Sequence, residues 1–473
     1  MGSCHSKADK KGRVHQAKAA RFSRRYTRVE DMPVVNRKAC GIDLSGASTH
    51  FTTLEIGDEL EEREFGATTP ELGAVVNYVA MHGITTVAME ATGVYWMVLY
   101  DMLETAGIEV YLVNPSHIKQ VPGRSKDDKL DATWLWRLHK YGLLSASFRP
   151  SEEIRPLRSW YRQRKRLVEF SADELRRQQK ALDMMNIRIH HAITDLGGVT
   201  GMRLVRAIVA GERDPHVLAI LRDCRCQCSP EELEDALTGF YVEHLVFELA
   251  QALARYDMLL KQIAEIDLKI EVVLQHLLPK VAQFTDVAAA LEAVKHPLPT
   301  GKHVPLFDVT AYIQLITGQD PTTLPGIGPM SVLGLLAELG QDMTKWKTEK
   351  HFGAFLRIAP VKRISGGKIL SVRTAPGLHP AAVIFLQAAA AASRSDSALG
   401  AFYRRLAVRI GKAKAMMATA YKIARRYYNL MRYGQAYQET GAAQYEEKYR
   451  QRQIAYLEKK AKQYGLVITP IAA

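Results

Sequence analysis

The sequence predicts an α/β domain followed by a mostly helical remainder. Short apolar runs alternate with segments of helical spacing up to about residue 150, and strand signals fade from residue 152 onward. The chain has 473 residues, 47% of them hydrophobic, which is enough apolar mass for more than one core. We expect a basic tail at 1–38, an α/β domain at 39–150, a helical region at 151–300 and a C-terminal domain at 301–473.

The α/β domain is predicted from strands and helices that follow one another in order. Its expected strands are 39–44, 49–56, 63–66, 85–89 and 109–113, the last of them stopped by Asn114-Pro115. Its expected helices are 70–81, 94–106 and 128–141. Alternation of this kind is typical of a sheet with helices packed on its faces.

The remainder of the chain has mainly helical spacing. Residues 155–193 and 231–278 are long, charged and helical in period, which predicts an antiparallel hairpin or a coiled coil. Proline and glycine mark residues 295–307 as a linker. Residues 310–435 are expected to be mostly helical with a break near 360–380, and the last 35 residues to form a basic helix.

The charge of the chain is concentrated at its two ends. Lys and Arg number 64 against 50 Asp and Glu, for a net charge of +14. Residues 1–38 carry +8 and residues 401–473 carry +11, so the residues between them carry −5. This balance excludes an acidic disordered protein and favours a polyanionic partner, because blocks of like charge often serve as interaction arms.

The number of cysteines and the hydropathy of the sequence indicate the cellular compartment of the protein. Five cysteines are too few for a disulfide framework in a chain of this length. Cys224, Cys226 and Cys228 alternate with other residues, whereas a zinc hairpin uses C-x₂-C, so free thiols are the favoured interpretation. No run of about 20 apolar residues and no secretory signal is present, and we expect a cytoplasmic protein without a membrane partner.

Four acidic residues stand where sites form in α/β sheets. Asp43 and Glu90 end two predicted strands, and Asp128 and Asp131 open a predicted helix with i, i+3 spacing. Each acid alone is also typical of a turn or a first helical turn. Together they predict a site for Mg²⁺ or Mn²⁺, because hard oxygen ligands bind such ions. Asp127 directly precedes Asp128 and is an alternative third acid.

The first strand also has a second interpretation. The run from Gly41 to Ser48 is similar to the phosphate-binding start of actin-like and sugar-kinase folds. Such folds carry a second Asp-x-Gly-Gly hairpin and a Gly-rich adenosine site, and neither pattern occurs here. The missing motifs disfavour this kinase-like interpretation.

Two glycine-containing turns in the C-terminal part indicate contact with phosphates. Leu324-Pro325-Gly326-Ile327-Gly328 has the composition of a helix-hairpin-helix turn, or of a plain turn between helices, whose amides can meet a phosphate. Further on, Ser365-Gly366-Gly367-Lys368 is expected in a basic loop between helices, where Lys362, Arg363 and Lys368 attract a phosphate. Ser365 is a candidate nucleophile and Ser371 an alternative, although an ordinary loop serine has the same pattern.

These motifs resemble, in order and separation, the bacterial insertion-sequence transposases that join a RuvC-like DEDD domain to a C-terminal serine domain, the bridge-RNA-guided recombinases. The resemblance covers residues 39–465 and rests on Gly41-Ile42-Asp43, Met89-Glu90-Ala91-Thr92-Gly93, Asn114-Pro115, Asp128-Lys129-Leu130-Asp131-Ala132, Tyr141-Gly142-Leu143-Leu144, Leu324-Pro325-Gly326-Ile327-Gly328, Ser365-Gly366-Gly367-Lys368 and Phe402-Tyr403-Arg404-Arg405-Leu406.

The resemblance implies a fold, a site and a set of partners. The fold is RNase H-like, with Asp43, Glu90, Asp128 and Asp131 as its acids. Ser365 would form a 5′-phosphoserine link to DNA during excision and insertion of a mobile element. The partners are donor and target DNA, a structured non-coding guide RNA and further copies of the chain, as a dimer of dimers. The expected nucleic-acid contacts are Gly326, Gly328, Lys362, Arg363, Gly366, Gly367, Lys368, Arg404 and Arg405.

Other functions stay open at this point. A metal-dependent nuclease or junction resolvase would use water in place of Ser365. A scaffold without catalysis would bind nucleic acid alone, although the complete set of four acids argues against it. The roles of residues 1–38 and of the three clustered cysteines lie outside the resemblance. Formation of the site between the serine of one copy and the acids of another is a further hypothesis.

Overall fold

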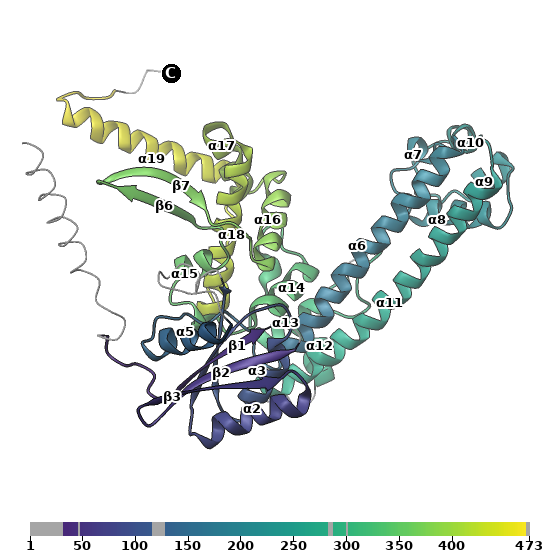
Figure 1. Ribbon diagram of the computed structural model, residues 1–473. Helices are drawn as coiled ribbons and strands as arrows, with labels where there is room; N and C mark the ends of the chain where they lie inside the picture. Colours follow the sequence, from purple (N-terminus) through teal and green to yellow (C-terminus); the bar gives the residue numbers. More distant parts are fainter. Residues whose placement is uncertain (1–31, 46–47, 116–127, 282–286, 299–300, 470–473) are drawn as a thin grey trace, which may run out of the picture. The chain divides into compact units, whose positions relative to one another are not determined.

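The computed structural model describes residues 32–45, 48–115, 128–281, 287–298 and 301–469 (Figure 1). It divides into two units, one up to Arg149 and one from Pro150 onward. The predicted tail at 1–38 lies mostly outside the described residues. The division at residue 300 stays a prediction.

The first unit is built on a five-stranded mixed sheet. Its strands are β1 (Ala39–Ser45), β2 (Thr49–Ile56), β3 (Glu59–Gly66), β4 (Thr86–Glu90) and β5 (Glu109–Val113). They lie in the order β3-β2-β1-β4-β5, in which β1, β4 and β5 are parallel and the hairpins on the β3 side are antiparallel. The mixed α/β architecture predicted for this part of the chain is confirmed.

Helices cover both faces of this sheet. Helices α2 (Thr69–Met81) and α3 (Trp96–Thr105) pack on one face, where Ile42 and Met89 are fully buried in the largest core of the unit. Helix α5 (Asp128–Lys140) packs on the other face, where Leu135 contacts Ala88. Successive residues of β4 point to opposite faces of the sheet, and helices cover both faces. Burial on both sides therefore explains why β4 is a continuous apolar run.

The second unit begins with a long helical hairpin. Helices α6 (Ile154–Met184) and α11 (Glu243–Val281) run side by side and carry four short helices at one end (Figure 1). These are α7 (Ile189–Ala192), α8 (Val199–Val209), α9 (Pro215–Ile220) and α10 (Pro230–Leu237).

The expected bounds of both long helices, 155–193 and 231–278, were wrong. The first helix ends earlier, at Met184, because Asn186, the residue after its C-cap Met185, adopts a left-handed conformation with φ of 57°. The second begins later because the chain turns at Gly239, where an added Cβ would lie 2.6 Å from the carbonyl oxygen of Met185. The residues before that turn form the separate helix α10, which begins in a capping box of Ser229 and Glu232.

Buried ion pairs join the two helices of the hairpin to each other and join α6 to the rest of the second unit. The Arg164 guanidinium on α6 binds the Asp267 carboxylate on α11, with Nε and Oδ1 2.5 Å apart. Glu338 of α14 (Pro329–Leu339) is 1% exposed and accepts hydrogen bonds from Arg158 and Arg162 of α6. Such pairs fix the mutual register of the helices because a buried charge without its partner is costly.

The remainder of the unit is mostly helical, as predicted. Helix α12 (Val287–Ala293) comes first, followed by irregular residues at 295–298 and 301–308. The helices after them are α13 (Val309–Thr317), α14, α15 (Glu349–Phe355), α16 (Pro380–Ser393), α17 (Ala398–Ile410), α18 (Lys412–Tyr433) and α19 (Gly441–Gln463). Helix α19 is the expected basic helix. Strands β6 (Pro360–Ser365) and β7 (Lys368–Thr374) form a hairpin between α15 and α16. None of the helices in the described ranges combines the length and apolar composition needed to span a membrane.

Candidate active site

Asp43 and Glu90 stand next to each other at the carboxyl ends of parallel strands. The register of β1 and β4 ends at the pair Ile42 and Met89, and the two acids follow directly. Both therefore point to the same face of the sheet, the one covered by α5. Asp43 is 7% exposed, and one Glu90 carboxylate oxygen accepts a hydrogen bond of 3.3 Å from the Thr92 hydroxyl. Asp43 does not end its strand as expected, because β1 continues to Ser45 by pairing with β2 alone.

Helix α5 runs antiparallel to these strands. Near its end, the His139 ring nitrogen Nε2 lies 2.9 Å from the hydroxyl of Thr86, which is the first residue of β4. The following carbonyl, that of Lys140, accepts the Val35 amide at 2.9 Å, just before β1. The first turn of α5 consequently lies at the opposite edge of the sheet, the edge of Asp43 and Glu90. Asp131 belongs to that turn and is half-buried.

A glycine allows α5 to lie directly on β1. A Cβ added to Gly41 would lie 2.3 Å from the carbonyl oxygen of Ala132 and 2.4 Å from the amide nitrogen of Trp136. Residues i and i+2 of a strand share a face, so Gly41 supports the helix and Asp43 projects from the same face one step further along. The sequence contained this residue as part of a motif, but its steric role depends on the packing of α5.

The third acid of the predicted set is only partly placed. Helix α5 begins at Asp128, so the predicted helix start is reproduced in its backbone. The side chain of Asp128 and the whole of Asp127 lie outside the described residues. In a helix, the i, i+3 spacing puts Asp128 on the same face as Asp131. The choice between Asp127 and Asp128 stays a prediction.

The acids at this edge of the sheet supply the donor chemistry of a site for a hard divalent cation. Asp43, Glu90 and Asp131 offer carboxylate oxygens, the ligands that Mg²⁺ and Mn²⁺ take in proteins. Carboxylates brought to one edge repel one another, and a bound cation offsets that repulsion. Among the described side chains, which do not include Asp128, no three potential ligands converge on one point.

Ser365 lies at the tip of the β6–β7 hairpin, not in an irregular loop as expected. Gly366 and Gly367 form its two-residue turn, with φ of 55° and 76°. Positive φ at both central residues is the geometry of a type I′ turn, which suits the twist of paired strands and favours glycine. The two glycines, expected as nucleic-acid contacts, form the turn of the hairpin in the structure.

The two faces of the hairpin differ in chemistry. The strand register puts Ser365 and its partner Lys368 on one face, together with Arg363 and its partner Ser371. Arg373 belongs to the same face, so both candidate serines stand among basic side chains. The opposite face carries Ile364, Ile369 and Val372, which are 61%, 56% and 50% exposed. Lys362 is on this apolar face and does not flank Ser365 directly.

The remaining predicted contact residues differ in their surroundings. Gly326 has φ of 79°, and an added Cβ would lie 2.3 Å from the Ala388 carbonyl oxygen, so packing against α16 requires this glycine. Gly328 caps α14 and has open space beside it. Arg404 donates to the Ser395 carbonyl at 3.0 Å and pairs with Asp396, whereas Arg405 lines a basic pocket. The clustered cysteines are free, with 3.3 Å between the sulfur atoms of Cys226 and Cys228.

Sequence reasoning missed most of that basic pocket. Four of its residues, Tyr445, Lys448, Tyr449 and Arg452, follow i, i+3, i+4, i+7 spacing on α19. This spacing was visible in the sequence and marks one helical face. The residues that meet it from α17 and α18 are distant in the chain, so only the packing of the three helices identifies them.

Comparison with family models assigns the chain. A DEDD transposase model of the IS110 type, described as Transposase, matches residues 40–187, and the model for the Transposase IS116/IS110/IS902 family matches residues 322–404. No curated protein matches the chain. The first match includes β1, β4 and α5 with their acids, and the second includes Gly326 and the β6–β7 hairpin. The chain belongs to the IS110-type insertion-sequence transposases, enzymes that act on DNA.

Proposed function

We propose that this transposase excises and inserts a mobile element with Ser365 as its nucleophile and a carboxylate-bound metal as its cofactor. The observation that carries the proposal is the meeting of Asp43, Glu90 and the first turn of α5 at one edge of the sheet. The position of Ser365 at the exposed tip of a hairpin, on its basic face, supports the choice of nucleophile.

The proposed step exchanges one phosphoester for another. The Ser365 Oγ attacks a DNA phosphorus, the bond from phosphorus to the 3′ oxygen breaks, and the 5′ phosphate stays on the serine. The serine proton passes to a base and the departing 3′ oxygen is protonated. A second 3′ hydroxyl reverses the step and rejoins the strands without ATP, because each bond broken is replaced by one of the same kind. Arg363 and Lys368 stabilise the charge that develops on the phosphate.

Asp43, Glu90, Asp131 and Asp128 are the residues that would hold Mg²⁺ or Mn²⁺. The bound ion supplies charge stabilisation for phosphoryl transfer. The chain itself holds the acids in fixed positions. Asp43 belongs to a strand that is paired on both sides up to Ile42, and α5 packs directly on Gly41. Removal of divalent ions with EDTA is expected to stop strand cleavage and leave DNA binding through Lys and Arg.

The finer architecture and partners belong to the same proposal. We assign an RNase H/RuvC-like fold to the first unit and coiled-coil packing to α6 and α11. A structured non-coding guide RNA and a dimer of dimers complete the assembly that the resemblance implies. The basic α19 and the basic stretch at 1–38 support a second polyanionic partner beside DNA. Sequencing of RNA that copurifies with the full chain tests the guide.

Covalent trapping on DNA tests the nucleophile. A labelled donor strand is incubated with the protein and Mg²⁺, and protein–DNA adducts are separated under denaturing conditions. Wild type is expected to form an adduct, Ser365→Ala to form none, and Ser371→Ala, on the same face of the hairpin, to retain it. Cleavage by Ser365→Ala without an adduct would identify a metal-dependent nuclease that uses water.

A mixing experiment tests whether the site forms between copies. Neither Ser365→Ala nor Asp43→Ala is expected to recombine DNA alone. If the serine of one copy works with the acids of another, the mixture of the two variants regains strand exchange. Failure of every mixing ratio to restore exchange would assign serine and acids to the same copy.

A further inference from the structure

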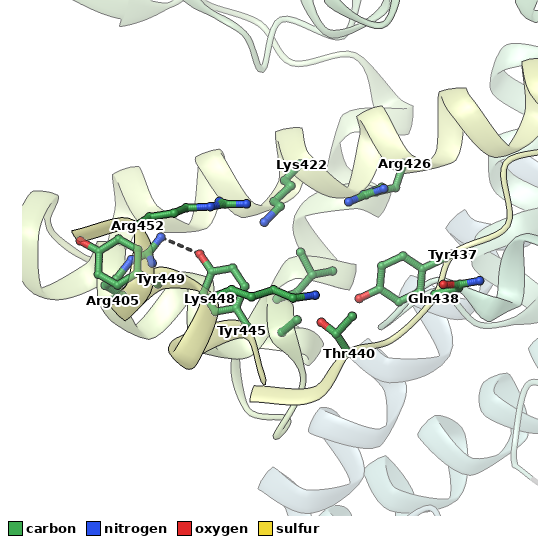
Figure 2. Close-up of a pocket in the computed structure, with 12 residues that line it drawn as sticks. Arg405, Lys422, Arg426, Tyr437, Gln438, Thr440, Tyr445, Lys448, Tyr449 and Arg452 are labelled. Carbon is green, nitrogen blue, oxygen red and sulfur yellow. Dashed lines mark hydrogen bonds between the residues drawn. The ribbon is translucent and has the colours of Figure 1, made fainter. Parts of the chain in front are cut away.

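A basic pocket of about 300 Å³ lies between α17, α18 and α19 (Figure 2). Its cationic lining residues are Arg405, Lys422, Arg426, Lys448 and Arg452. Figure 2 shows the ends of Lys422, Arg426 and Lys448 directed toward the space between α18 and α19. None of the described residues that line the pocket carries a carboxylate; beside the five cations and three tyrosines, the lining consists of Ala398, Leu399, Gln438 and Thr440.

The helices are spaced to produce this surface. Lys422 and Arg426 are i and i+4 on α18, and Lys448 and Arg452 are i and i+4 on α19, so each pair shares one helical face. Arg405 completes the set from α17, where its Nη2 donates a 2.6 Å hydrogen bond to the Tyr445 hydroxyl. Its guanidinium carbon lies 3.6 Å from the centre of the Tyr449 ring. Tyrosines therefore orient this cation without neutralising it.

The cations of the pocket lack anionic partners. Within the described part of the chain, none of the five is within ion-pair distance of a carboxylate, and the buried Nη1 of Arg405 has no hydrogen-bond partner. Arg425, a neighbour of Arg426 on α18, is by contrast paired with Glu349 of α15. The fold pairs a nearby arginine and leaves those of the pocket available to a ligand.

Burial and charge act on Lys422 in the same direction. Desolvation, followed by the charges of Arg426, Arg405, Arg425 and Arg452, lowers the pKa of Lys422 to about 8. Its ammonium lies 4.2 Å from the centre of the Phe402 ring and 5.2 Å from that of Tyr445. A bound anion relieves the repulsion among these groups, whereas the empty pocket must hold them together at a cost.

The nearest carboxylate of the α18–α19 connection is already engaged. Glu439 accepts hydrogen bonds from the amides of Ala398 and Gly441 and from the hydroxyl of Tyr437, at 2.7 to 2.9 Å. It holds the connection in place and positions Tyr437 at the pocket. The pocket is therefore open to an anion that comes from outside the chain.

We propose that this pocket binds a phosphate group of a nucleic-acid strand, through residues other than Ser365 and the four predicted acids. Clustered Lys and Arg side chains are the usual partners of phosphodiesters, and tyrosine rings beside them offer stacking surfaces for an unpaired base. The inference requires only that the protein binds nucleic acid, and it is independent of the proposed nucleophile. It assigns to α19 a role in anchoring a strand.

Binding of labelled oligonucleotides to the full chain tests the pocket. The probes are a 20-nucleotide DNA strand, its duplex and the corresponding RNA strand, each titrated over a series of NaCl concentrations. The Lys448→Gln/Arg452→Gln variant is compared with Lys459→Gln/Lys460→Gln, which removes the same charge from exposed positions of the same helix that do not line the pocket.

The pocket variant is expected to lose affinity by about 10-fold or more and to lower the slope of log K against log salt by about 1, as for one phosphate contact. The control is expected to stay close to wild type. If the pocket variant loses affinity for RNA alone or for DNA alone, the result supports the proposal and identifies the type of strand that the pocket binds. Equal loss in both variants, or displacement of the probes by inorganic phosphate with no difference between variants, would overturn it.

Two further measurements separate this outcome from misfolding and from failure of the proposed chemistry. Lys422→Gln probes the pocket from α18 and is expected to weaken the same probes, even if the α19 variant loses helix content by circular dichroism. Calorimetry of the oligonucleotides at pH 8 in two buffers is expected to show proton uptake by wild type and none by Lys422→Gln. The Ser365→Ala chain should retain wild-type binding in every arm, and loss there would trace the effect to the hairpin.

Discussion

The contact between Gly41 and α5 makes a quantitative prediction about the candidate site. In Gly41→Ala, the new Cβ would lie 2.3 Å from the Ala132 carbonyl oxygen, against 3.4 to 4 Å in ordinary contacts. The helix backbone must therefore retreat by about 1 Å, and overpacking of this kind costs about 3 kcal/mol of unfolding free energy. Because Asp131 moves with α5, we also expect cleavage to fall about 100-fold in molecules that remain folded.

Urea denaturation and hydrogen exchange of the full chain measure the first effect, and cleavage of a labelled donor strand measures the second. Gly73→Ala is the matched control in the same unit. Its Cβ would lie 3.8 Å from the Met102 side chain, an ordinary contact, and alanine inside α2 is expected to stabilise the helix by about 0.5 to 1 kcal/mol. Exchange in Gly41→Ala should accelerate first in β1 and α5.

The result that refutes this reasoning is specific. A Gly41→Ala chain that matches wild type in urea midpoint and in cleavage rate would show that α5 is not seated on β1. A chain that loses stability but keeps its cleavage rate would show that the position of α5 does not set the geometry of the carboxylates. Only loss of both supports the proposed site.

Three further predictions follow from the geometry. Gly367→Ala places a Cβ at φ of 76°, which costs about 1 to 2 kcal/mol, and is expected to lower the yield of covalent adduct about 10-fold, whereas Gly366→Asn retains it. Glu338→Gln leaves Arg158 and Arg162 facing a neutral side chain, and urea titration should show a free energy of unfolding lower by about 2 kcal/mol. This loss is smaller than the roughly 3–5 kcal/mol expected when a fully buried pair is broken, because Arg162 is partly exposed. Burial lowers the pKa of His139 to about 4, so between pH 6.5 and 4 the unfolded chain binds a proton that the folded chain does not. The free energy of unfolding should therefore fall by up to about 3 kcal/mol as the pH decreases over this range. Urea denaturation of His139→Gln at a series of pH values should show a weaker pH dependence.

Local patterns predicted the first unit well. The expected strands and helices between residues 39 and 141 correspond to those observed, with ends shifted by a few residues. Parallel strands such as β4 are continuous apolar runs, and the helices between them have clear periodicity, so the pattern alone identifies both. The location of the candidate site then follows, because acids near the carboxyl ends of parallel strands lie at the same end of the sheet.

Errors arose where tertiary contacts override local periodicity. The charged pattern after residue 231 is helical throughout, but Gly239 packs on the Met185 carbonyl and divides it. The segment around Ser365 was expected to be irregular, although Gly366-Gly367 between alternating residues is a hairpin signal. The basic pocket needs three helices to assemble, so no window of the sequence contains it.

The exposed hairpin has a consequence for when the enzyme can act. A two-stranded ribbon with both faces in solvent has little to hold its hydrogen bonds closed, so β6 and β7 are expected to open at a free energy far below that of global unfolding. With Ser365 at its tip, the proposed nucleophile would be ordered only when something covers the apolar face of Ile364, Ile369 and Val372. Reactivity would then be conditional on assembly, and an isolated copy would leave the genome uncut.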